Sequence, residues 1–306
     1  MKALISLGFV AWLSFGTGAL VEAEDFSIAS FNLNNFRVMT GETRRARSEE
    51  SRRWVVDEIA FARPDIIGLQ ELGSKQALAS LQRDLAVRGV EYPHRVFLSA
   101  PDQEIHCGIL SRFPIQSDRS DRDVPFLLYG RKYQVLRGIM EVDVILPGST
   151  VLTVFNVHLK SQLPSWIADE RDFRLAEAVE LGKRVQRRLR SGDEAWIAVL
   201  GDFNDHPTSR TMKMVLGSGK RRLRDTRPSE PSSVPSGASG KRRATGIAWT
   251  HYFEREDSYS RFDYVLISRG LERVWVRDES SIPEFRAWSL ASDHRLIEAT
   301  FELPDG

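Results

Sequence analysis

Residues 151–161 read Val-Leu-Thr-Val-Phe-Asn-Val-His-Leu-Lys-Ser. The β-branched run over 151–157 predicts a buried strand, and this strand ends at His158. A second stretch, residues 196–205, reads Trp-Ile-Ala-Val-Leu-Gly-Asp-Phe-Asn-Asp and predicts another strand with polar residues at its end. The charged segment 165–190 between them carries an apolar stripe at helical spacing. The chain therefore alternates strands with helices around this region.

The same patterns predict further elements on both sides. Strands are predicted at residues 26–31, 65–69, 105–111, 137–146, 262–267 and 296–301, and helices at 51–62 and 74–88. The segment 217–246 breaks the pattern, because it is rich in Gly, Ser and Pro and has the basic clusters Lys220-Arg221-Arg222 and Lys241-Arg242-Arg243 near its ends. We expect a flexible surface loop within a single domain over residues 24–306. This loop either grips a phosphate backbone or is a solvated loop with incidental charge.

The composition excludes several classes of protein. With 306 residues, 42% of them hydrophobic and 28% charged, the chain can bury a large core and is not a disordered polypeptide. A single cysteine, Cys107, rules out an internal disulfide and a cysteine-based zinc site, and its sequence context predicts a buried thiol. The net charge of +1 provides no global attraction for nucleic acid or membrane, so local charge must hold any anionic partner.

The N-terminus resembles a secretory signal. Met1-Lys2 is followed by an uncharged run over 3–21, and the small residues of Val21-Glu22-Ala23 suit a signal peptidase. We therefore expect residues 1–23 to be removed and the protein to be exported to the periplasm or the cell exterior. The alternative is an uncleaved membrane anchor, which small and polar residues within the run make less suitable.

Polar residues that suit a hard cation lie where predicted strands end. They are Asn32, Glu71, Asp202, Asn204 and Asp293. Strand ends on one sheet edge bring together residues that are distant in sequence. Oxygen ligands of this kind suit Mg²⁺, Mn²⁺ or Ca²⁺ better than zinc.

Two of the six histidines stand out. His158 ends the strand over 151–157, and His294 directly follows Asp293. An imidazole works as a general base near pH 7 when a carboxylate fixes its tautomer, and Asp263 is the candidate for that role. Each residue also has a structural interpretation when taken alone, such as a helix cap for Glu71 or a turn for Asn204.

Seven segments in order carry a family resemblance. They are Phe31-Asn32-Leu33, Gln70-Glu71, residues 108–115 (Gly-Ile-Leu-Ser-Arg-Phe-Pro-Ile), residues 156–161 (Asn-Val-His-Leu-Lys-Ser), residues 201–205 (Gly-Asp-Phe-Asn-Asp), Phe262-Asp263-Tyr264 and Ser292-Asp293-His294. In this order the chain resembles the endonuclease/exonuclease/phosphatase superfamily over about residues 25–303. That group includes pancreatic-type deoxyribonucleases, abasic-site endonucleases, sphingomyelinases and inositol-polyphosphate 5-phosphatases. The form of the motifs is most similar to that of secreted bacterial members.

The resemblance implies an α/β (α+β) fold, a four-layer sandwich in which two mixed sheets pack face to face with helices outside. It also implies that Glu71 is the principal metal ligand, with Asn32 and Asp293 on the same metal side. The expected ion is Mg²⁺, with Mn²⁺ or Ca²⁺ as alternatives.

The resemblance assigns the remaining residues to the reacting phosphate. Asp202 and Asn204 match a pair that contacts the phosphate, the water or a second metal, and His158 matches a histidine that stabilises phosphoryl oxygens or aids the leaving group. His294 matches the general base, oriented by Asp263. Arg137 and Lys160 are weaker candidates for phosphate contacts, and an ion-pair role for Arg137 is equally open.

The expected reaction is hydrolysis of a phosphodiester by in-line attack of water, without a covalent enzyme intermediate. A nuclease should carry basic residues around its cleft, and the candidates are Arg37, Arg44-Arg45, Arg47, Arg131-Lys132, Lys160 and the basic clusters of 217–246. We expect a nucleic acid substrate, a monomer and no stable membrane insertion after signal cleavage.

Three alternatives stay open. A sphingomyelinase requires an exposed apolar hairpin, for which Pro125 to Tyr129 is a candidate that is expected to be buried. An inositol-phosphate phosphatase requires a denser basic pocket. A non-catalytic binding module is disfavoured because the full set is present, namely Glu71, Asp202, Asp293 and His294.

Overall fold

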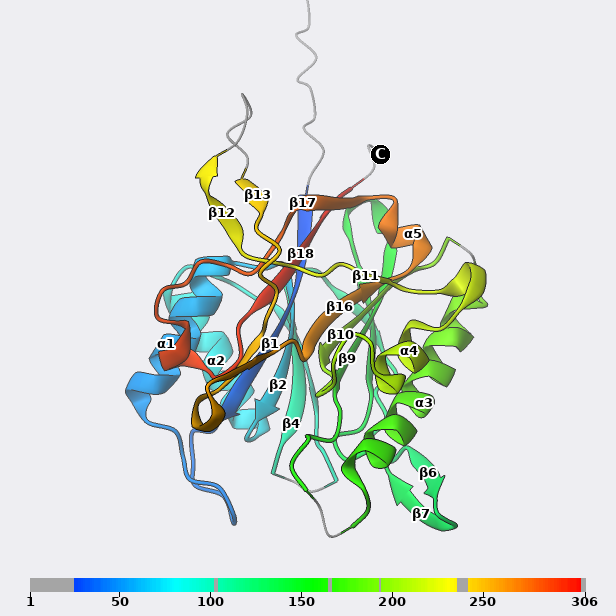
Figure 1. Ribbon diagram of the computed structural model, residues 1–306. Coiled ribbons are helices and arrows are strands. Elements are labelled where there is room, and N and C mark those ends of the chain that lie inside the picture. The colour runs from blue at the N-terminus through cyan, green and yellow to red at the C-terminus, as the bar shows by residue number, and fades with distance from the viewer. Residues whose placement is uncertain (1–24, 102–103, 165–166, 193, 236–241, 304–306) are drawn as a thin grey trace, which may run out of the picture.

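Two six-stranded sheets pack face to face in this protein (Figure 1). The computed structural model describes residues 25–101, 104–164, 167–192, 194–235 and 242–303. In order across the first sheet the strands are β17 (Trp275–Ser281), β18 (Ile297–Glu302), β1 (Asp25–Phe36), β2 (Ile66–Leu72), β4 (His106–Ser111) and β3 (His94–Leu98). Across the second they are β11 (Arg224–Asp225), β16 (Asp263–Ile267), β10 (Trp196–Asp202), β9 (Val151–His158), β8 (Met140–Ile145) and β5 (Ile115–Asp118). Both sheets are mixed, because β1 with β2 and β9 with β10 are parallel pairs and the other pairs are antiparallel.

Helices cover the outer faces of both sheets. The helices α1 (Glu49–Ala62) and α2 (Lys75–Val87) lie on the first sheet, and α3 (Glu170–Leu189) and α4 (Arg210–Leu216) lie on the second (Figure 1). Two short helices, α5 (Arg269–Glu272) and α6 (Trp288–Ala291), lie in the C-terminal part. The predicted four-layer α/β sandwich is therefore confirmed. Among the described residues, no helix has both the length and the apolar character needed to cross a bilayer.

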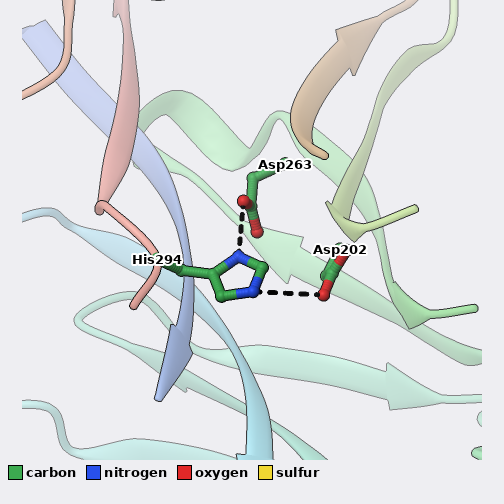
Figure 2. Close-up of side chains that lie close together, drawn as sticks. All are labelled: Asp202, Asp263 and His294. Atoms are coloured by element: carbon green, nitrogen blue, oxygen red, sulfur yellow. Dashed lines mark hydrogen bonds and ion pairs between the residues drawn. The ribbon is translucent and has the colours of Figure 1, made fainter. Parts of the chain in front are cut away.

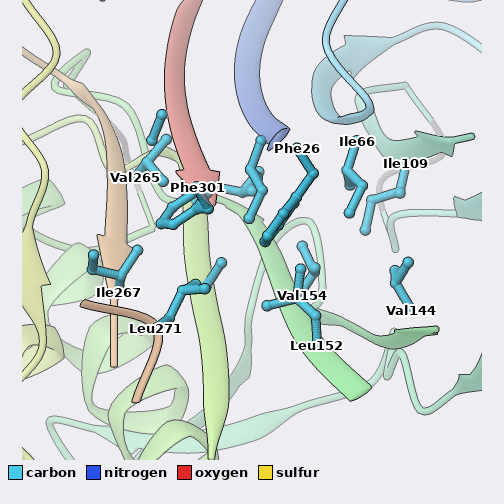
Figure 3. Close-up of a cluster of buried hydrophobic side chains, with 14 of the residues drawn as sticks. Phe26, Ile66, Ile109, Val144, Leu152, Val154, Val265, Ile267, Leu271 and Phe301 are labelled. Carbon is cyan, nitrogen blue, oxygen red and sulfur yellow. The ribbon is translucent and has the colours of Figure 1, made fainter. Parts of the chain in front are cut away.

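The apolar core between the two sheets comes from strand residues that alternate along each strand. Ile66 and Phe301 of the first sheet meet Val154 and Val265 of the second in this layer (Figure 3). Period-two alternation in both sheets produces this result, because every second side chain points toward the opposite sheet. Cys107 is a buried thiol in the same layer, as the sequence predicts.

Several element boundaries differ from the prediction for local reasons. The helix expected from residue 165 begins at Glu170, because the Asp169 carboxylate caps it and accepts hydrogen bonds from the Arg171 and Asp172 amides. The strand expected from Arg137 begins at Met140, because Gly138 has φ of 68° and closes a turn.

The described residues of the segment predicted as a flexible loop, 217–235 and 242–246, include short strands. The segment contains β11, which pairs with β16, and the ladder of β12 (Pro231–Pro235) with β13 (Arg242–Ala244). Figure 1 shows β12 and β13 near the end of the molecule at which β1 begins. Lys241 lies outside the described residues. Local composition missed these strands because their partners are distant in sequence.

Two further hairpins complete the fold. The strands β14 (His251–Phe253) and β15 (Ser258–Ser260) form one, and β6 (Pro125–Leu128) and β7 (Arg131–Gln134) form the other. The expected burial of 125–129 is correct only in part. Phe126 is buried, but Leu127 and Tyr129 are 69% and 66% exposed, because the hairpin packs only one face against the core beneath α3.

A buried carboxyl on α1 makes stability depend on pH. Glu58 accepts a hydrogen bond from the Leu296 amide at 3.4 Å, and its other oxygen has no partner among the described residues. Burial raises the pKa of Glu58 to about 8, so the folded chain holds a proton that the unfolded chain releases near pH 4.5. The free energy of unfolding should therefore fall as pH rises between these values.

We expect Glu58→Gln to stabilise the protein relative to the wild type at pH 8.5 by roughly 2–4 kcal/mol, and much less at pH 5. Urea unfolding at the two pH values measures the difference. Glu50→Gln, an exposed change on the same helix, is the control. An equal effect of Glu58→Gln at both pH values would contradict the prediction.

Candidate active site

The strand register brings three candidate residues into a row. Asp202 is the last residue of β10, and it pairs with His158 on parallel β9 and with Asp263 on antiparallel β16. In the first sheet, Asn32 on β1 pairs with Gln70 on β2, so Glu71 lies one residue beyond it. The predicted convergence of these strand ends is therefore present in the structure.

A direct contact joins the two sheets at this edge. The Asn32 side-chain amide donates to Asp202 Oδ2 at 2.9 Å. The other oxygen of Asp202 accepts the Asn204 backbone amide at 2.8 Å, which fixes the Asn204 turn with φ of 51°. Asp202 is thus a buried carboxylate held from both sheets.

His294 lies between two carboxylates (Figure 2). Its Nδ1 is 2.8 Å from Asp263 Oδ2, and its Nε2 is 3.8 Å from Asp202 Oδ2. The first distance is a hydrogen bond, so Asp263 orients the ring as predicted. The second is too long for one and leaves room for Nε2 to engage a substrate atom.

The charge of this cluster differs from the expected neutral imidazole. Burial by itself would lower the pKa of His294, but the carboxylates of Asp263 and Asp202 outweigh it and raise the pKa to about 10. Burial raises the pKa of Asp202 to about 7, although His294 opposes that shift. The two carboxylates therefore favour the imidazolium form of His294, while burial favours the protonated form of Asp202.

His158 is the opposite case. Burial lowers its pKa well below the usual value, and the nearby charge of Arg137 adds to the effect. Its Nε2 is 3.6 Å from Asp202 Oδ2, and its Nδ1 has no hydrogen-bond partner among the described residues. Arg137 is 7% exposed, and its Nε and Nη1 atoms also have no hydrogen-bond partner among the described residues. Unpaired buried donors next to one another indicate a place for an anion.

Two of the predicted metal-side residues, Glu71 and Asp293, are more exposed than the buried cluster, whereas Asn32 is buried against Asp202. The Glu71 side chain is 18% exposed, accepts the Asn35 amide at 2.9 Å, and has Arg44 at 4.0 Å. The Asp293 side chain is 44% exposed. Glu71 itself has φ of 61°, an unusual backbone conformation for a residue with a side chain.

The donor set fits a hard divalent cation. Glu71 and Asp293 add carboxylates near the buried pair Asp202 and Asp263, which leaves an excess of negative charge. The tightest group of possible ligands is a different one, Asp202, Asp263 and His294, whose ligand atoms all lie within 4.8 Å of one another. Within this group His294 is hydrogen-bonded to Asp263. Glu71 and Asp293, the ligands that the family resemblance implies, are not part of it.

Several basic candidates are already engaged. Lys160 donates from Nζ to the Ser161 and Leu163 carbonyls, so the structure does not favour its predicted phosphate role. Arg37 is buried against Glu104. Arg47 donates hydrogen bonds to the Leu33 and Ala291 carbonyls and so connects β1 with α6. The basic cluster Lys220 to Arg222 precedes β11, whose Arg224 pairs with Ile267, four residues along β16 from Asp263.

One residue near the centre was missed. His251 on β14 forms a bridge with His294, and the two ring centroids are 4.6 Å apart. Its Nε2 lies 3.9 Å from Asp293. No local signal in the sequence marks His251, because this proximity depends on how the β14–β15 hairpin folds back.

The chain belongs to the endonuclease/exonuclease/phosphatase family, whose model matches residues 29–294. The family resemblance of the sequence is thus confirmed. A comparison with curated proteins finds no similar sequence.

Three solved structures with a similar fold are compared with this chain. The catalytic domain of human Nocturnin has a TM-score of 0.62 at 18% identity, covering 91% of this chain and 94% of that one. TDP2 from Caenorhabditis elegans has a TM-score of 0.61 at 19% identity, covering 94% of this chain and 78% of that one. Sphingomyelinase C from Streptomyces griseocarneus has a TM-score of 0.62 at 14% identity, covering 92% of this chain and 100% of that one. At these identities the similarity shows the shared fold.

Proposed function

We propose that this protein is an exported, divalent-metal-dependent phosphodiester hydrolase that acts on nucleic acid. The observation that carries the proposal is the buried group of Asp202, Asp263 and His294, with His158 paired to Asp202 on the next strand. Family membership supports hydrolysis of a phosphoester.

The metal side consists of Asn32, Glu71 and Asp293. Glu71 and Asp293 would hold Mg²⁺, or Mn²⁺ or Ca²⁺ in its place, and Asn32 would support them. The bound ion would polarise a phosphoryl oxygen and neutralise charge on the leaving oxygen.

The chain's own residues supply proton transfer and hydrogen bonds. Asp202, with a pKa near 7, is better suited to take the proton of the attacking water than His294, which is already protonated. The His294 imidazolium donates from Nε2 to a phosphoryl oxygen, and Asp263 holds the ring in place. The family resemblance instead assigns the base to His294, whose Nε2 lies 3.8 Å from Asp202.

The unpaired donors opposite the metal side complete the phosphate site. Arg137 offers Nε and Nη1, and Asn204 has a side-chain amide of which one N–H is used by the Leu159 carbonyl. A doubly anchored phosphate would satisfy these buried groups, which are otherwise costly to leave unpaired.

The alternative substrate is a phospholipid such as sphingomyelin. The exposed Leu127 and Tyr129 of the β6–β7 hairpin, with Arg131 and Lys132 exposed beside them, favour contact with a lipid surface.

A substrate panel tests the proposal. The protein lacking residues 1–23 is assayed with Mg²⁺ or Mn²⁺ on plasmid DNA, single-stranded DNA and RNA, sphingomyelin and an inositol polyphosphate. We expect nucleic acid to be cleaved and EDTA to abolish the cleavage. Sphingomyelin hydrolysis without nucleic acid cleavage would reject the nuclease proposal and favour the lipid alternative.

A further inference from the structure

A cavity of about 510 Å³ is lined by residues from the N-terminal ends of α3 and α4 and from the loops before them. The two helices lie side by side on the second sheet (Figure 1). We call this cavity the α3–α4 groove, and its wall includes Gln162, Arg171, Asp205, His206 and Arg210. Cavities of this size are typical of sites for small molecules or single nucleotides.

The groove is continuous with the candidate active site. Asp205 and His206 directly follow Asn204, and the Gln162 amide donates to the Asn204 carbonyl at 3.1 Å. Arg174, buried in the floor, binds Asp205 at 3.2 Å and the Lys160 carbonyl at 2.9 Å. The two loops that follow β9 and β10 therefore form one side of the phosphate site and one wall of the groove.

Aromatic rings connect the two places. The ring of His294 lies 4.6 Å from that of His251, which lies 5.2 Å from Phe262. Phe262 in turn lies 5.4 Å from His206, an exposed ring at the rim of the groove. Exposed rings beside a phosphate site are surfaces on which nucleobases stack.

The charges in the groove suit a nucleotide. Arg171 and Arg210 are exposed and form no ion pair within the described part of the chain, so their donors are free for a phosphate. The nearby Asp172 accepts a hydrogen bond from the Tyr129 hydroxyl. The carboxylate of Glu170 also lines the groove and can accept a hydrogen bond from the amino group of a nucleobase. Leu175 is the one aliphatic hydrocarbon side chain in the lining, and the other lining residues are polar or charged, which suits a nucleotide better than a lipid tail.

We propose that the α3–α4 groove binds the nucleotide next to the scissile phosphate, so that the substrate is an unpaired strand of at least two nucleotides. The inference rests on the proposed function. A base held in a duplex is stacked and paired and cannot enter a recess of this kind, whereas a base of a single strand can.

The test compares two substrates. One is a single-stranded hexanucleotide, and the other is bis(p-nitrophenyl) phosphate, which has no neighbouring nucleotide. For the double variant Arg171→Ala/Arg210→Ala we expect kcat/KM on the hexanucleotide to fall about tenfold or more, with bis(p-nitrophenyl) phosphate within twofold of the wild type. Arg83→Ala, an exposed change on α2, is the matched control and should alter neither. An equal fall on both substrates, or no fall on the hexanucleotide, would overturn the inference.

A binding measurement separates this inference from the proposed function. Fluorescence anisotropy with a labelled hexanucleotide is recorded with Mg²⁺ in an His294→Ala background, with and without the two arginine changes. We expect binding to weaken and the slope of log K against log salt to become shallower by about 0.7 for each lost phosphate contact. If the wild type hydrolyses neither substrate, the proposed function fails, but the binding measurement still tests whether the groove binds the oligonucleotide. No binding by the parent, or unchanged binding by the double variant, would reject the groove.

Discussion

Replacing His294 with alanine should lower kcat for phosphodiester hydrolysis by about 10²–10⁴-fold. His294 lies between Asp202 and Asp263 in the buried cluster, and its Nε2 is 3.8 Å from Asp202, too far for a hydrogen bond. The loss should therefore appear in kcat more than in KM, because the interaction strengthens as charge develops in the transition state.

Initial rates on bis(p-nitrophenyl) phosphate, with circular dichroism to confirm folding, measure this effect. His94→Ala, on edge strand β3, is the control and should keep the wild-type rate. A folded His294→Ala variant with full activity would show that the cluster is structural.

Changing Glu71 to glutamine should reduce kcat/KM by about 10²-fold or more at a fixed low Mg²⁺ concentration. The amide keeps the shape of the side chain but removes the negative charge that would hold the cation. High Mg²⁺ should restore part of the rate, because the defect lies in binding the ion.

Metal activation curves and the shift of Tm with Mn²⁺ measure the change independently of catalysis, since an ion that binds only the folded state stabilises it. Glu50→Gln on α1 is the matched control. An unaltered metal requirement in Glu71→Gln would remove Glu71 from the metal side.

Local patterns in the sequence predicted individual strands and helices and the polar residues at the strand ends, whereas the four-layer arrangement came from the family resemblance. The β-branched run over 151–157 and the apolar run before Asp202 indicate buried strands, and their polar ends follow directly. The order of the motifs then placed the chain in its family, which the match over residues 29–294 confirms.

The charge of His294 and the hydrogen bonds of Arg47 could not be predicted from the sequence, because both depend on contacts between residues that are distant in it. The protonation of His294 requires two carboxylates, Asp202 and Asp263, that approach only through the β10–β16 register. Arg47 likewise donates hydrogen bonds to the Leu33 and Ala291 carbonyls, and Ala291 is more than 240 residues away in the sequence. A basic residue in a sequence shows charge, but only the fold shows whether that charge is free to meet a substrate.

The signal peptide predicted at residues 1–23 lies outside the described residues, so export remains a proposal. Its test is the N-terminal sequence of the protein recovered from the periplasm or the medium, which should begin near Glu24.

The most direct test of the central account is the metal dependence of bis(p-nitrophenyl) phosphate hydrolysis by the purified protein without residues 1–23. The account predicts hydrolysis that rises with Mg²⁺ or Mn²⁺, disappears in EDTA, returns when the metal is restored, and is lost in His294→Ala. Hydrolysis of the same rate in EDTA, or no hydrolysis by the folded protein at any metal concentration, would contradict it.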